Sequence, residues 1–134
     1  MEYLIGVILG VIVAAAGRII GLDRERAFYS TVLIVVAFYY VLFAVMGASP
    51  TVLAEEIAIG LAFTGMAAYG FRRNMWLVAA GITGHGVFDF TRHLFIHNSG
   101  VPVWWPGFCG SIDLALGAWV AICLAISAPA PADS

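Results

Sequence analysis

Residues 3–20 read YLIGVILGVIVAAAGRII, an apolar run whose one charged side chain is Arg18. An apolar run of this length is typical of a transmembrane helix, because about 20 helical residues cross the hydrocarbon core of a bilayer. The run is followed by Gly21 and the charged segment DRER at residues 23–26, which suits a loop at a membrane face. We expect a retained helix and not a cleaved signal peptide, because no positive charge precedes the run.

Four further apolar stretches follow, separated by short charged or turn-rich segments. The predicted fold class is therefore all-α: a polytopic membrane bundle of five transmembrane helices that forms one domain over residues 1–128. The last residues, PAPADS at 129–134, are expected to be a disordered tail. The five predicted spans are 3–20, 27–47, 51–70, 75–97 and 107–128.

The composition of the chain agrees with a membrane protein. Of its 134 residues, 63% are hydrophobic and 10% are charged, whereas a soluble domain is about half apolar and about a quarter charged. Lysine is absent and the net charge is −2, so no nucleic-acid partner is expected, because such a partner requires a basic surface. We expect the lipid bilayer as the surroundings, and a homo-oligomer or a membrane partner protein to shield so small a bundle.

The arginines predict the orientation. Arg24, Arg26, Arg72 and Arg73 lie in the loops after the first and third predicted helices, and the loops after the second and fourth hold no arginine or lysine. The positive-inside rule then places the N-terminus outside and the C-terminus in the cytoplasm of a bacterial inner membrane. A four-helix alternative, in which the second or third stretch lies differently, would divide the arginines between the two faces.

Small residues predict which helices pack closely. Gly6, Gly10 and Ala14 recur at every fourth position of the first predicted helix, a spacing that lets helix backbones approach. The second predicted helix has no glycine in its interior and is rich in bulky β-branched and aromatic residues. We expect it to face lipid.

Ionisable residues gather in the fourth predicted helix, whose residues 84–97 read GHGVFDFTRHLFIH. At about 100° per residue, His85, Asp89, Arg92 and His93 share one helix face. A charge at the centre of a membrane helix costs about 2.5 to 3.5 kcal/mol. These groups must therefore pair, take up protons or bind a cation.

Two other helices place acids at a similar depth. At about 1.5 Å per residue from the outer helix ends, Asp89 lies about 12 Å deep, Asp113 about 9 Å and Glu56 about 6 to 8 Å. His85 lies about 18 Å deep, and Glu55 lies beside Glu56. The sequence predicts an acidic and histidine-rich pocket in the outer half of the bilayer.

Carboxylates and imidazoles one helical turn apart can bind the same divalent metal, with zinc or iron as the candidates. The predicted ligands are Glu56, Asp89, His93 and Asp113. His85 lies too far from His93 along the helix to share an ion with it, so we assign His85 to a proton relay and give Asp89 an additional acid–base role.

Supporting residues are expected around this pocket. Arg92 follows Asp89 by three positions, which predicts an ion pair between them. Trp105 and Cys109 either line the mouth of the pocket or, in the case of Trp105, anchor the chain at the membrane interface. Tyr39 and Tyr40 can donate phenolic hydrogen bonds or belong to the aromatic belt.

The segment from His85 to Asp113 contains three short motifs, His-x-x-x-Asp-x-x-Arg-His, VPVWWP at residues 101–106 and Cys-x-x-x-Asp. It resembles a family of small bacterial integral membrane proteins to which no activity is attached, so the resemblance implies a membrane location and nothing about a reaction.

Three functions remain open from the sequence. The first is metal binding in the membrane, in an enzyme that acts on a lipid or a small hydrophobic substrate. The second is a transporter or channel component that conducts protons or a cation through the same groups. The third is a structural accessory subunit in which buried ion pairs fix the helix register.

Overall fold

The computed structural model describes residues 1–128, and every regular element in that range is helical. The all-α prediction is confirmed, and the predicted tail at 129–134 lies outside the described residues. Two short 3₁₀ turns accompany five α-helices. The elements in chain order are α1 (Glu2–Ile20), η1 (Leu22–Arg24), α2 (Arg26–Gly47), α3 (Pro50–Arg73), α4 (Met75–Thr91), η2 (Arg92–Leu94) and α5 (Trp105–Ser127).

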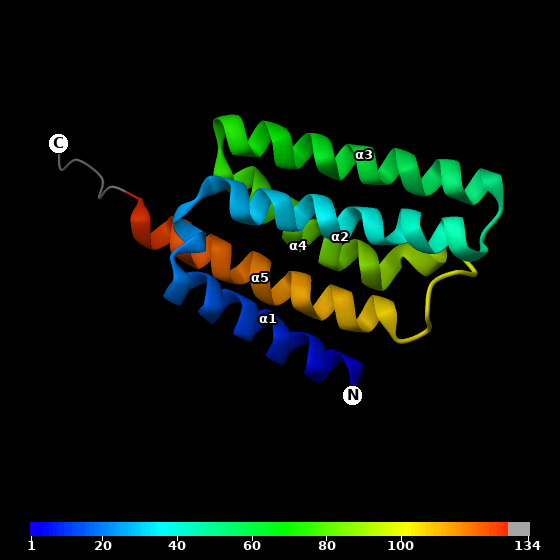
Figure 1. Cartoon of the computed structure of the whole chain (residues 1–134), viewed down its shortest axis with the longest axis horizontal. Coiled ribbons are helices and arrows are strands. Elements are labelled where there is room, and N and C mark those ends of the chain that lie inside the picture. The colour runs from blue at the N-terminus through cyan, green and yellow to red at the C-terminus, as the bar shows by residue number, and fades with distance from the viewer. Residues whose placement is uncertain (129–134) are drawn as a thin grey trace.

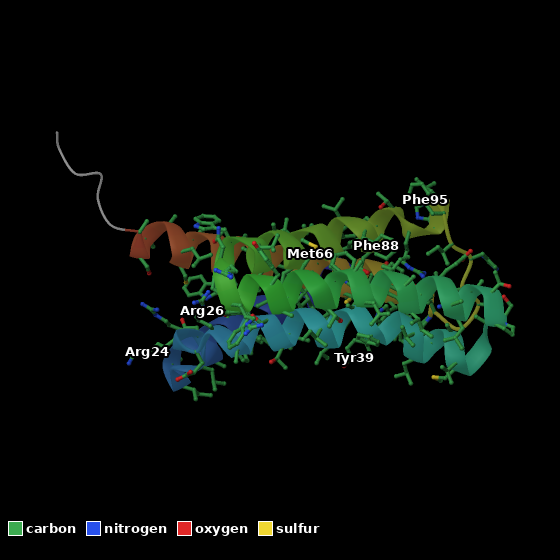
Figure 2. The ribbon with its side chains drawn as sticks, turned by 90° about the horizontal axis from the view of Figure 1, so that it is seen from above. Arg24, Arg26, Tyr39, Met66, Phe88 and Phe95 are labelled. Carbon is green, nitrogen blue, oxygen red and sulfur yellow. The ribbon has the colours of Figure 1, made fainter. Side chains whose placement is uncertain are left out.

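The helices lie lengthwise beside one another as a bundle (Figure 1). Helix α5 packs on both α1 and α4, while α3 packs on α2 and α4. One end of the bundle holds η1 and the α3–α4 junction, and Arg24 and Arg26 lie there (Figure 2). The opposite end holds the N-terminus, the α2–α3 junction and the segment that links α4 to α5, with Phe95 close to it.

Side-chain caps fix where two of the helices begin. The hydroxyl of Ser49 accepts a hydrogen bond from the Val52 backbone N–H, and Pro50 occupies the first position of α3. The side-chain oxygen of Asn74 accepts one from the Trp76 backbone N–H at the start of α4. Both are ordinary helix-start signals.

Four helices, α1, α2, α3 and α5, are long and apolar enough to cross a membrane, which indicates a membrane protein. Helix α4 has 17 residues and ends at Thr91, so the α-helix is shorter than the predicted span at 75–97. The chain tightens into η2 and turns back, which buries Arg92, Ile96 and Asn98 and leaves His93 exposed.

The glycine stripe of α1 packs as predicted. Gly6 and Gly10 are buried against α5, where a Cβ on Gly6 would collide with the backbone oxygen of Phe108 and one on Gly10 would lie 2.9 Å from the Ala115 Cβ. The expectation that the second helix faces lipid is wrong for one of its faces, since Leu33, Ala37 and other residues of α2 are buried, while Leu42, Val45 and other apolar side chains of α2 are exposed. Bulky apolar side chains suit lipid and a protein interior equally well, so their presence does not distinguish the two.

We expect Gly6→Ala to destabilise the bundle by about 1 to 3 kcal/mol, because the added methyl group has no room against the α5 backbone. The matched control is Gly65→Ala in α3, where a Cβ has nothing within 4 Å and the stability should be unchanged or rise by up to about 1 kcal/mol. Circular dichroism during denaturation measures both. Equal effects of the two substitutions would contradict close packing of α1 on α5.

Candidate metal centre

Two pairs of side chains face each other where α4 meets α5. His85 and Asp89 lie one turn apart on α4, and Cys109 and Asp113 lie one turn apart on α5. Residues four positions apart lie on the same helix face, so each helix presents two metal-ligating groups to the other.

Glycines allow the two helices to approach. A Cβ on Gly86 would lie 3.0 Å from the backbone oxygen of Gly110, and a Cβ on Gly110 would lie 3.1 Å from the Asp89 Cβ. Both distances are tighter than ordinary van der Waals contact. A side chain at either position would therefore push the two pairs apart.

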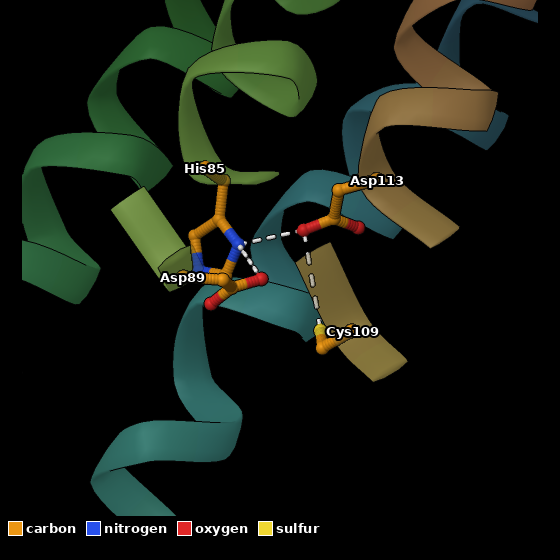
Figure 3. Close-up of side chains that lie close together, drawn as sticks. All are labelled: His85, Asp89, Cys109 and Asp113. Carbon is orange, nitrogen blue, oxygen red and sulfur yellow. Dashed lines mark hydrogen bonds and ion pairs between the residues drawn. The ribbon is translucent and has the colours of Figure 1, made fainter. Parts of the chain in front are cut away.

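The four side chains converge on one point (Figure 3). The His85 Nδ1 atom lies 2.7 Å from Asp113 Oδ2 and 3.5 Å from Asp89 Oδ2, and the Cys109 Sγ atom lies 4.0 Å from Asp113 Oδ2. One ligand atom from each residue lies within 4.8 Å of all the others, and every residue is at least 97% buried. This group could hold a metal ion.

These spacings are near those of a tetrahedral site. Zinc bonds of about 2.0 to 2.3 Å place ligand atoms about 3.3 to 3.7 Å from one another. The contact of 2.7 Å between His85 and Asp113 would therefore lengthen, and the widest separation of up to 4.8 Å would shorten by about 1 Å.

The charge in this group is not balanced by the groups around it. Within the described chain, Asp89 Oδ2 and Asp113 Oδ1 are buried and accept no hydrogen bond. Two carboxylates share a single imidazole, so even a protonated His85 leaves one negative charge. A buried charge of this kind requires a proton or a bound cation.

A second polar group lies toward the end of the bundle that holds the α4–α5 segment. Arg92 forms an ion pair with Glu56 of α3, and its guanidinium lies 3.9 Å from the centre of the Tyr40 ring. Asn98 donates to the Glu56 carboxylate at 3.0 Å and to the backbone oxygen of Tyr40 at 3.1 Å. The α4–α5 segment is thereby attached to α2 and α3.

Tyr40 connects the two groups. Its hydroxyl donates a hydrogen bond of 2.5 Å to Asp89 Oδ1, and its ring lies beneath Arg92. The phenol orients the Asp89 carboxylate and leaves the other carboxylate oxygen directed toward His85. Among the aromatic residues considered from the sequence, Tyr40 and not Tyr39 provides this hydrogen bond.

The structure does not bring together the predicted ligand set of Glu56, Asp89, His93 and Asp113. Glu56 is occupied by Arg92, and His93 is exposed on η2 because α4 ends before it. His85, assigned to a proton relay from the sequence, lies in the group instead, together with Cys109. The predicted ion pair between Asp89 and Arg92 is also replaced, since Arg92 reaches Glu56.

The remaining predicted residues lie beside the site. Tyr39 is half-buried and its ring centre lies 5.0 Å from that of Trp105. Both belong to an aromatic cluster with Phe43 and do not join the four-residue group. Sequence reasoning missed Asn98, because a polar residue in a turn-rich segment gives no sign that it reaches back to an acid on another helix.

No protein-family model, curated protein or solved structure matches this chain. The function must therefore be argued from the geometry of the site.

We expect Glu56→Gln to lower the free energy of unfolding by about 3 kcal/mol or more, because it leaves the buried guanidinium of Arg92 without its counter-ion. Glu55 is the matched control, since it is adjacent in sequence and exposed. Glu55→Gln should change the stability by no more than about 0.5 kcal/mol. Denaturation of both variants in the same detergent makes the comparison, and equal stabilities would contradict a buried ion pair.

Proposed function

We propose that this protein is a five-helix integral membrane protein with a transition-metal site held by His85, Asp89, Cys109 and Asp113. The observation that carries the proposal is the convergence of four buried ligand-type side chains with too little positive charge around them. Burying two such acids together in an apolar bundle costs free energy that nothing else in the group recovers.

The length of α4 supports five membrane spans. Its 17 residues extend about 26 Å, and the three residues of η2 add about 6 Å. The total is close to the hydrocarbon thickness of about 30 Å. With the arginine-bearing end in the cytoplasm, the N-terminus lies outside and the metal site lies nearer the outer face of a bacterial inner membrane.

The set of ligands favours zinc, with iron as the second candidate. A thiolate, an imidazole and carboxylates together suit a borderline divalent ion better than magnesium or calcium, which prefer oxygen ligands alone. With the thiol and both acids deprotonated, the ligands carry −3 and a divalent ion reduces this to −1. The hydrogen bond from Tyr40 stabilises the remaining charge at Asp89.

The site also suits a reaction on a lipid or a small hydrophobic substrate. If Asp89 keeps its hydrogen bond to Tyr40, the other three residues suffice to hold the metal and one coordination position is open, as in catalytic zinc sites. A zinc ion held in this way would supply a Lewis acid. Asp89 would then act as the acid–base group next to it, positioned by Tyr40.

Proton or cation conduction is the second candidate, and the interior of the bundle disfavours it. On the inner side of His85, the buried residues of the described chain include Leu33, Val78, Ile82 and Leu116, which form an apolar core. A proton relay requires polar groups that continue across the membrane. A structural subunit or a homo-oligomer remains compatible with the Glu56–Arg92 ion pair, but neither accounts for the thiol and two acids around His85.

Metal analysis of the purified protein tests the proposal. We expect about one zinc or iron per chain, and a loss of at least tenfold in metal affinity for Cys109→Ser and for Asp113→Asn, because each removes a ligand. Cys123→Ser and His93→Gln are matched controls that should keep the metal, since both residues lie outside the group. Elemental analysis and a competition titration with a chelator provide the measurements.

Substitution with cobalt separates specific ligation from adventitious binding. A cobalt-loaded protein should show a thiolate-to-cobalt charge-transfer band that disappears in Cys109→Ser and persists in Cys123→Ser. A band that disappears in Cys123→Ser, or metal bound equally by all four variants, would contradict the proposed site.

A further inference from the structure

A further polar site lies at the end of the bundle that holds η1, away from the candidate metal centre. A cavity of about 180 Å³ is bounded by η1, the first turns of α2 and the last turns of α5, with Asp23, Arg24, Arg26 and Tyr29 among its lining residues. Met75 and Leu124 contribute an apolar side. The cavity exceeds the volume of a single water, which occupies about 30 Å³ in the liquid.

Two residues that line this cavity each have a buried polar atom without a hydrogen-bond partner in the part of the chain that the structure describes. The atoms are Asp23 Oδ1 and the hydroxyl of Tyr29. The side chain of Asp23 is 4% exposed and Tyr29 is 4% exposed. The other Asp23 oxygen lies 3.3 Å from Arg18, so one oxygen of the carboxylate is paired and the other is not.

The Asp23 oxygen and the Tyr29 hydroxyl would bind a hydrogen-bond donor of a ligand, and a positively charged donor would bind most strongly. An unpaired buried carboxylate oxygen costs free energy that a charge-assisted hydrogen bond recovers. The phenol of Tyr29 can accept a second hydrogen bond from the same group. A primary ammonium group, with three N–H donors, meets both requirements.

The residues at the rim of the cavity favour a ligand that carries a negative charge next to its ammonium group. Arg24 and Arg26 are exposed there, and Arg26 makes one hydrogen bond, of 3.4 Å, to the backbone oxygen of Gly70. Guanidinium groups suit phosphate. Ile19 and Ile20, at the end of α1 that leads through Gly21 into η1, are 85% and 70% exposed and offer an apolar surface.

We propose that this cavity binds the headgroup of phosphatidylethanolamine, with the ammonium at Asp23 and Tyr29, the phosphate at Arg24 and Arg26, and the acyl chains along the exposed end of α1. Phosphatidylcholine lacks N–H donors, and phosphatidylglycerol lacks the cation. The site is independent of the metal centre, which lies toward the other end of the bundle.

Native mass spectrometry of the full-length protein tests this proposal. The protein is equilibrated with an equimolar mixture of phosphatidylethanolamine, phosphatidylcholine and phosphatidylglycerol that carry identical acyl chains, and the retained lipids are counted. We expect about tenfold preference for phosphatidylethanolamine over phosphatidylcholine, the ratio that corresponds to one charge-assisted hydrogen bond. This comparison requires no substitution, so it does not depend on the folding of a variant.

Variants locate the binding. Asp23→Asn should reduce the preference to about twofold or less, and Tyr29→Phe should reduce it by a smaller factor. Glu25→Gln is the control, because Glu25 is an exposed acid two residues from Asp23 that does not line the cavity. The Glu25→Gln variant should prefer phosphatidylethanolamine as strongly as the unmodified protein does. Equal retention of all three lipids would show no selection of the headgroup and would overturn the proposal. A preference for phosphatidylglycerol, or a preference that Asp23→Asn leaves unchanged, would also overturn it.

Discussion

The close contact between α4 and α5 is the feature on which the rest of the structure depends. Gly86 and Gly110 let the helix backbones meet, and this meeting brings the Asp113 carboxylate of α5 to the imidazole of His85, which Asp89 already faces one turn along α4. In a hydrocarbon environment the approach of two acids is unfavourable unless something compensates their charge. Tight packing and two acids at one imidazole together make this the group of the described chain that could hold a metal ion.

The end of the bundle that holds the α4–α5 segment packs against this group through a series of contacts. Arg92 is held by Glu56 and lies over Tyr40, whose hydroxyl orients Asp89. Asn98 attaches the α4–α5 segment to the same group. The charges of Glu56 and Arg92 are thus neutralised in a pair, while the carboxylates of Asp89 and Asp113 share the single imidazole of His85.

The sequence predicts local features well and long-range contacts poorly. The apolar runs predict the helices, and the stripe of Gly6 and Gly10 predicts the packing of α1, because both depend on neighbouring residues of one helix. The spacing also identifies Asp89 and Asp113 as acids of one pocket. It fails at Arg92, which pairs with Glu56 of another helix. It also fails at the end of α4, where the helix stops at Thr91, and it therefore assigns the ligand role to His93 instead of His85.

X-ray absorption spectroscopy of the metal-loaded protein tests the central claim most directly, because it reports which atoms surround the ion. The account predicts one sulfur at about 2.3 Å and two or three nitrogen or oxygen ligands at about 2.0 Å. Coordination by nitrogen and oxygen alone would contradict it, as would a protein that takes up no metal above the level of a Cys109→Ser variant.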